Sequence, residues 1–102
     1  MVFTEFSVAP FDKGESLSKY VAEVINLIDN SGLDYRLGAM TTTVEGDVHE
    51  IFDLIKKCHL KMRQYSNRVV THITIDDREG ACNRLFGKPE SIEKKLGKKL
   101  KK

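Results

Sequence analysis

Residues 41–55 read TTTVEGDVHEIFDLI, and this stretch decides the fold because its periodicity changes within a few positions. Three threonines and a valine favour an extended strand, which the following glycine ends. Asp47 and Glu50 then form a capping-box arrangement, and the apolar residues behind them recur at helical spacing. The stretch therefore predicts a strand at residues 41–45 followed directly by an amphipathic helix. A carboxylate, Glu45, stands at the last position of that strand.

The rest of the chain adds further elements on both sides of this stretch. Apolar residues at helical spacing predict a helix at residues 17–28, capped by Ser16 or Ser18 and ended by Ser31 and Gly32. The other predicted elements are strands at residues 2–8, 35–39 and 68–76 and a short helix at residues 89–96 with Pro89 in its first turn.

This order of strand, helix, strand, strand, helix, strand predicts an α+β fold with ferredoxin-like βαββαβ topology. Its four-stranded antiparallel sheet would carry two helices on one face, and the short C-terminal helix is an addition to it. We expect residues 1–87 to form a single domain and residues 88–102 to form a basic helical tail. The other face of the sheet has no predicted cover, so it is either wet or buried by another subunit.

Alternation along each strand assigns side chains to this open face, because neighbouring residues of a strand point to opposite sides. The residues assigned to the open face are Phe3, Glu5, Ser7, Arg36, Gly38, Thr43, Glu45, Arg68, Val70, His72 and Thr74. Those assigned to the helix-covered face are Phe6, Val8, Tyr35, Leu37, Thr42, Val44, Val69, Thr71, Ile73 and Ile75. The mixture of carboxylates, hydroxyls, an imidazole and one aromatic ring suits an interface between subunits that contains polar pockets.

Composition narrows the class of protein. A chain of 102 residues with 40% hydrophobic and 31% charged residues is typical of one soluble globular domain. No apolar run is long enough to cross a bilayer and the N-terminus lacks a secretion signal, so we expect a cytoplasmic protein without a membrane partner. The two cysteines, Cys58 and Cys82, are expected to be free thiols.

Charge is divided unevenly along the chain. Residues 88–102 carry seven lysines and two glutamates, a net charge of +5, whereas residues 1–87 carry ten basic and thirteen acidic side chains, a net charge of −3. We interpret the tail as a solvated end. An RNA-recognition module shares the predicted topology, but it stacks bases on aromatic rings of the first and third strands. The third strand here has no ring, and two carboxylates on the open face would repel phosphates, so no nucleic-acid partner is expected.

The residue pattern does not predict an enzyme. Ser7 could lie near His72 if the first and last strands are neighbours, but no glycine-rich oxyanion loop accompanies either residue. The three histidines are scattered along the sequence and neither cysteine belongs to a C-x-x-C pair, so no metal is expected. We also expect no resident cofactor.

Glu45 has two interpretations. In the first, it ends a strand at the surface near the N-terminus of the next helix, where a negative charge is favoured by about half a kcal/mol. In the second, it accepts hydrogen bonds from the ring nitrogen or amino group of a flat cationic heterocycle, with Thr43 fixing orientation and Phe3 and Glu5 nearby. Residue types alone do not separate the two.

Three segments of the sequence resemble the small thiamine-binding-protein family. They are residues 8–40, 41–59 and 68–78, in which SGLDY, the following T-x-V-E-G and the RV…IDDR strand are the most specific elements. The loop VAPFDKGES departs from the small, glycine-containing turn of many relatives, which puts ligand contacts from this loop in doubt.

The resemblance implies a ferredoxin-like subunit that assembles as a homotetramer, a dimer of dimers with packed sheets. It implies binding of thiamine or its hydroxymethylpyrimidine portion where sheets of different subunits meet, without chemistry on the ligand. Glu45 and Thr43 are the positions that the resemblance assigns to the ligand, and strand alternation adds Ser7 and His72. The alternative is a structural or regulatory oligomer with no small-molecule ligand.

Overall fold

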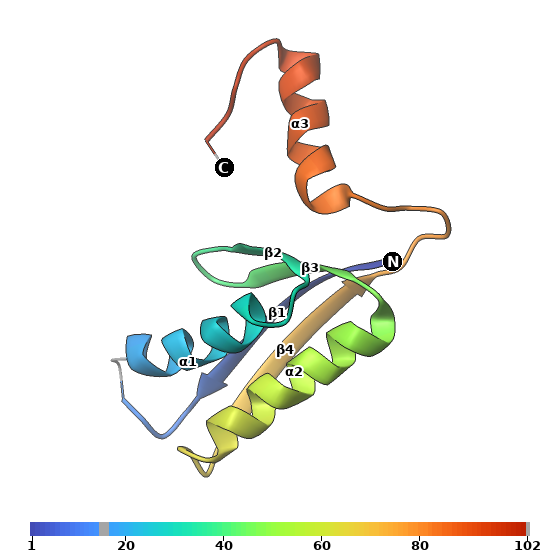
Figure 1. The fold of residues 1–102 in the computed structure, drawn as a ribbon. Coiled ribbons are helices and arrows are strands. Elements are labelled where there is room, and N and C mark those ends of the chain that lie inside the picture. Colours follow the sequence, from blue (N-terminus) through green and yellow to red (C-terminus); the bar gives the residue numbers. More distant parts are fainter. Residues whose placement is uncertain (15–16, 102) are drawn as a thin grey trace.

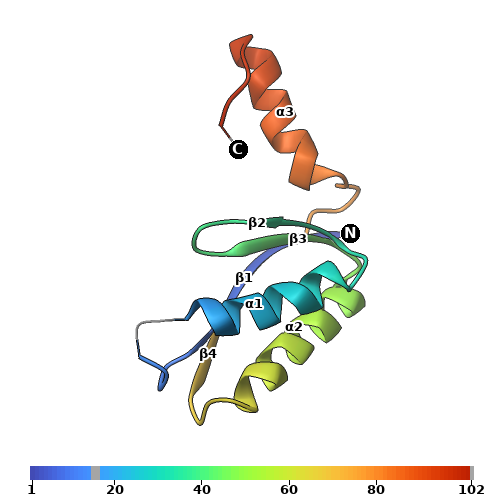
Figure 2. The ribbon, with the colours of Figure 1, turned by 60° about the vertical axis from the view of Figure 1, so that its left-hand side comes forward.

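A computed structural model describes residues 1–14 and 17–101 of the 102-residue chain. Its elements are β1 (Val2–Pro10), α1 (Ser18–Asp29), β2 (Asp34–Leu37), β3 (Thr42–Gly46), α2 (Val48–Arg63), β4 (Val69–Asp76) and α3 (Arg84–Leu96). The strands form a four-stranded antiparallel sheet in the order β2-β3-β1-β4. Helices α1 and α2 lie on one face of this sheet, and α3 projects beyond the other (Figures 1 and 2). The predicted α+β, ferredoxin-like fold is confirmed.

The register of the strands confirms which side chains share a face. Phe6 of β1 lies opposite Thr42 of β3 and Ile73 of β4, all three on the helix-covered side. Glu5, one position earlier, lies opposite Thr43 and Thr74 on the open side. Because side chains alternate along a strand, these pairs determine which face each of the remaining residues of the three strands points to.

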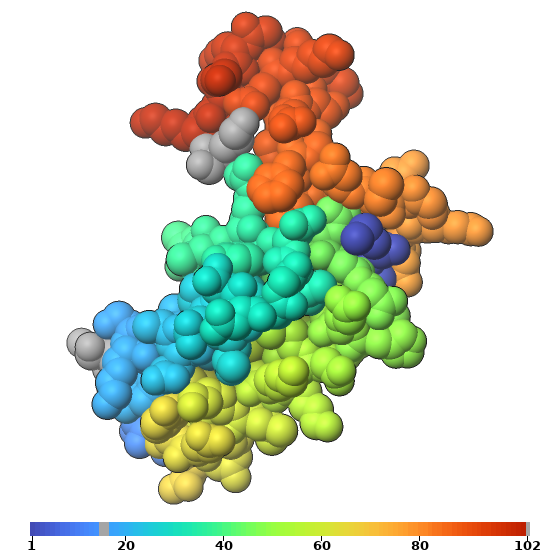
Figure 3. Space-filling view, viewed as in Figure 1, coloured from blue at the N-terminus to red at the C-terminus, as the bar shows by residue number. Residues whose placement is uncertain are grey.

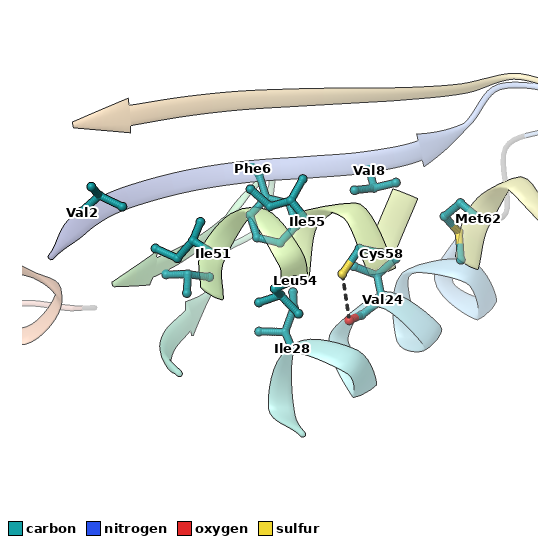
Figure 4. Close-up of a cluster of buried hydrophobic side chains, with 11 residues drawn as sticks. Val2, Phe6, Val8, Val24, Ile28, Ile51, Leu54, Ile55, Cys58 and Met62 are labelled. Atoms are coloured by element: carbon teal, nitrogen blue, oxygen red, sulfur yellow. Dashed lines mark hydrogen bonds between the residues drawn. The ribbon is translucent and has the colours of Figure 1, made fainter. Parts of the chain in front are cut away.

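The core lies between the sheet and the two helices that cover it, and Figure 4 shows most of its members. Residues of α2 recur in it at positions three and four apart, which is the stripe expected of an amphipathic helix. The buried cluster consists of Val2, Phe6, Val8, Val24, Ile28, Val44, Ile51, Leu54, Ile55, Cys58 and Met62. Asp47 caps α2 as predicted: its Oδ2 accepts hydrogen bonds from the backbone N–H groups of His49 and Glu50.

One predicted helix cap and one predicted helix start were wrong. Ser18 is the first residue of α1 and not its cap, while Leu17 occupies the cap position and makes no side-chain hydrogen bond. The other candidate cap, Ser16, lies outside the described residues. Helix α3 begins at Arg84, five residues before the predicted start, so that Pro89 lies inside the helix. The predicted boundary after residue 87 falls within α3, and the division into a domain and a tail remains a prediction.

Strand ends differ from the predictions by one or two residues. Strand β2 ends at Leu37 because the next residue, Gly38, donates its N–H to the carbonyl oxygen of Thr41 and closes the turn to β3. A Cβ at Gly38 would stand 2.6 Å from that oxygen, so the turn requires glycine. Within the described residues, no helix is both long and apolar enough to cross a membrane.

Cys58 and Cys82 are both free but differ in environment. The Cys58 thiol lies in the core, with its Sγ 4.0 Å from the carbonyl oxygen of Val24 (Figure 4). Burial raises the pKa of the Cys58 thiol to about 11, because the thiolate would lose its hydration. Cys82 is exposed in the loop before α3.

We therefore predict that iodoacetamide at pH 8 alkylates Cys82 in the folded protein and reaches Cys58 only after unfolding in denaturant. Mass spectrometry of quenched samples measures both rates. The pKa of the Cys58 thiol is higher in the folded protein than in the unfolded chain, where it is near 9. The thiol therefore contributes fully to stability below pH 9, and this contribution is lost as the pH rises toward 11. Equal labelling of both thiols in the native protein would show that Cys58 is not sealed in the core.

Candidate functional site

The open face of the sheet has a covered part and a bare part. The first turn of α3 contacts β3 and β2 at one end of the face, and the rest of the helix stands off the body (Figure 3). Thr43 and Arg36 are half-buried there, whereas His72 and Thr74 of β4 remain exposed. The candidate ligand positions therefore lie in two different environments.

Glu45 is attached to the first turn of α3. The backbone N–H of Arg84 donates to its Oε2 at 2.8 Å, and the N–H of Leu85 donates to its Oε1 at 3.3 Å. The Glu45 side chain is only 3% exposed. The first N–H groups of a helix have no partners within it, and a carboxylate also favours the positive end of the helix dipole. Glu45 therefore caps α3 from a distant strand.

The residue that precedes α3 explains why the cap comes from elsewhere. Asn83 occupies the cap position but makes no side-chain cap hydrogen bond, and its backbone is left-handed with φ 53°. The first sequence interpretation placed Glu45 beside the N-terminus of the next helix. That helix, α2, is capped by Asp47, and Glu45 serves a helix 39 residues further along the chain.

Arg84 holds the same turn on the sheet through its side chain. Its Nη1 donates to Oδ2 of Asp76 at 2.7 Å, and its Nη2 donates to the Asp76 carbonyl oxygen at 2.7 Å. The guanidinium carbon lies 5.2 Å from the ring centroid of Phe3, within cation–π distance. Phe3 is the cross-strand partner of both Glu45 and Asp76, so the three side chains line one row of the open face.

A second arginine–aromatic contact lies beside the first. The guanidinium carbon of Arg36 on β2 is 5.1 Å from the ring centroid of Phe86 on α3. The Nε atoms of Arg36 and Arg84 are both buried without a hydrogen-bond partner. Buried donors without partners cost free energy, so the contact between α3 and the sheet is imperfectly satisfied.

The four predicted ligand residues form two pairs rather than one cluster. Glu45 and Thr43 lie two residues apart on β3, while Ser7 and His72 are direct partners across β1 and β4. The partner of Glu45 on β1 is Phe3, and Ser7 is four residues further along, or roughly 13 Å at the usual strand rise. The neighbourhood of Ser7 and His72 was foreseen. Nothing in the sequence pointed to Arg84 or Asp76 beside Glu45.

Between these pairs, Glu5 accepts a hydrogen bond from the hydroxyl of Thr41 at 3.1 Å. Across residues 1–14 and 17–101, no three histidine, cysteine, aspartate or glutamate side chains are grouped so as to hold a metal ion. The open face thus combines carboxylates, hydroxyls, an imidazole and an aromatic ring with the guanidinium groups of Arg36 and Arg84. Its carboxylates and hydroxyls can accept hydrogen bonds, and its ring can stack against a flat group.

We predict that Glu45→Gln loosens α3 without unfolding the body. The amide keeps one acceptor but turns an NH₂ group toward a backbone N–H, so the free energy of unfolding should fall by about 1–3 kcal/mol. Hydrogen exchange at the Arg84 and Leu85 amides should become faster. Glu5→Gln is the matched control, because Glu5 is a carboxylate on the same face of the sheet, on the neighbouring strand β1. Equal effects of the two substitutions would contradict the assignment of Glu45 as the cap.

Comparison with known proteins identifies relatives along almost the whole chain. A family model described as thiamine-binding protein matches residues 4–93. The UPF0045 protein MJ1052 of Methanocaldococcus jannaschii is 36% identical over 91 residues, which cover 89% of this chain and 91% of the relative. A UPF0045 protein of Staphylococcus xylosus is 34% identical over 88 residues, with 81% of this chain and 82% of the relative covered.

Solved structures show the same fold. The crystal structure of MJ1052, described as a hypothetical protein, superposes with a TM-score of 0.80 at 34% identity and covers 94% of this chain and 95% of its own. A second crystal structure is that of TM0486 from Thermotoga maritima, described as a candidate thiamine biosynthesis or salvage protein. It superposes with a TM-score of 0.73 at 28% identity and covers 94% of this chain and 95% of its own. The chain therefore belongs to the thiamine-binding protein family.

Proposed function

We propose that this protein binds thiamine, or a related pyrimidine such as its hydroxymethylpyrimidine portion, at interfaces between copies of the chain. The family supports a thiamine-related role. The observation that carries the proposal is a carboxylate placed beside an aromatic ring on the open face: Glu45 is the direct cross-strand partner of Phe3. Opposite partners on one face of an antiparallel pair are close enough to touch one ligand.

The chemistry of thiamine matches these groups. Its aminopyrimidine ring is flat and carries an amino donor, and its thiazolium ring is a cation. Glu45 can accept from the amino group and balance the positive charge, Phe3 can pack against a ring, and Thr43 offers a hydroxyl two residues from Glu45. The net charge of −3 over residues 1–87 also favours a cationic ligand. We propose binding without catalysis, in keeping with the family's description.

Assembly between copies is supported by the edge of the sheet. Strand β4 is an edge strand, and its helix-facing Ile73 and Ile75 remain 42% and 36% exposed. With Phe52 and Leu60 of α2, Ile73 borders a shallow, mainly apolar groove of about 310 Å³. Soluble proteins rarely leave an edge strand and apolar side chains uncovered together. A second copy pairing along β4 would cover both, and contact between open faces would complete a dimer of dimers.

The ligand proposal predicts stabilisation by thiamine. A ligand at one hundred times its dissociation constant stabilises the folded state by about 2.7 kcal/mol. Thermal unfolding and calorimetry with thiamine, thiamine phosphates and hydroxymethylpyrimidine measure this effect. Glu45→Gln should weaken binding, whereas Glu50→Gln on α2 should leave it unchanged. The ligand proposal fails if none of these compounds produces heat or a thermal shift in the wild-type protein.

The assembly proposal predicts that Ile73→Asp lowers the mass measured by light scattering, because a charge cannot be buried at an apolar edge without cost. Met40→Asp is the control, since Met40 is an exposed apolar residue in the hairpin turn between β2 and β3. An unchanged mass in the Ile73 variant would exclude the β4 edge as the interface. A change in mass in Glu45→Gln, without any ligand effect to lose, would favour the purely structural alternative.

A further inference from the structure

The first turn of α3 stands where the proposed ligand would bind. Both carboxylate oxygens of Glu45 already accept main-chain hydrogen bonds from Arg84 and Leu85. With the side chain 3% exposed, a ligand in solution has almost no access to that carboxylate. Binding at Glu45 therefore requires that this turn move away from the sheet.

The turn also presents the same chemistry as the proposed ligand. The guanidinium group of Arg84 is a flat cation over the ring of Phe3, at 5.2 Å, and two N–H donors of the turn meet Glu45. Thiamine would bring a flat cationic system to the same ring and an amino donor to the same carboxylate. The helix and the ligand therefore compete for one set of partners.

The contacts of this turn with the sheet are few. Leu85 is the one buried side chain of α3, whose residues are all described, and most of the helix projects away from the body (Figure 3). The ion pair of Arg84 reaches an Asp76 side chain that is 57% exposed, where solvent screens the attraction. Against these contacts stand the two buried Nε atoms without partners and the left-handed backbone of Asn83. Because few contacts hold the turn and these features oppose them, we expect the turn to detach from the sheet without unfolding the body.

We infer that α3 is a built-in competitor for the ligand site, docked on Glu45 in the free protein and released when thiamine or its pyrimidine binds. This inference rests on the proposed function and adds a regulatory role to it. Only molecules in which α3 is undocked can then bind the ligand, so the apparent affinity falls in proportion to the fraction that is undocked. Ligand binding in turn leaves the C-terminal helix detached from the sheet. Any partner that held α3 away from the sheet would raise the affinity.

Two measurements test the inference. Hydrogen–deuterium exchange of the full chain should show faster exchange in residues 84–90 when saturating thiamine is added. Calorimetry should show that Arg84→Ala binds thiamine more tightly, by about three- to tenfold, because the docked state loses its cation–π contact and ion pair. Arg68→Ala is the matched control: its guanidinium carbon lies 5.3 Å from the Phe11 ring centroid, and its removal should not change thiamine affinity. Circular dichroism checks that both variants are folded.

The outcomes separate this inference from the proposed function. Binding of thiamine with unchanged or slower exchange in α3, or weaker binding by Arg84→Ala, would overturn the competitor role and leave thiamine binding intact. If neither protein binds thiamine, its phosphates or hydroxymethylpyrimidine, the proposed function fails and the competitor role falls with it.

Discussion

Two hydrogen bonds from the start of α3 to the carboxylate of Glu45 determine which part of the sheet is open. They bring a helix from the end of the chain onto the face that α1 and α2 leave bare. The covered end contains Glu45, Phe3 and Arg36, and the bare part runs along β1 and β4. Without this cap, α3 would lack a partner for its first N–H groups, because Asn83 supplies none through its side chain.

The electrostatics of α3 agree with this arrangement. A carboxylate lies at its N-terminus, and Lys94 and Lys95 lie in its last turn, so both ends of the helix dipole meet a favourable charge. The basic end stands away from the mildly acidic body, and the lysines remain in water. The charges at its two ends thus favour the helix, while its attachment to the sheet is confined to the first turn.

The fold was predictable because its signals are local. The Asp47 cap, the helical spacing of Ile51, Ile55 and Met62, and the alternation along β1 all agree with the structure. The start of α3 was not predictable by the same rules. Gly87 and Pro89 are helix breakers by local propensity, and the carboxylate that caps the helix lies 39 residues away in sequence. Likewise, the burial of Glu45 depends on a tertiary contact that no periodicity reveals.

The proposed ligand and the helix use the same side chains, so the position of α3 is the central claim. A crystal structure of the protein grown with thiamine tests this claim most directly. We expect density for a flat ring between Phe3 and Glu45, with residues 83–88 moved off the sheet. A ligand bound elsewhere, while Arg84 and Leu85 still donate to Glu45, would contradict it.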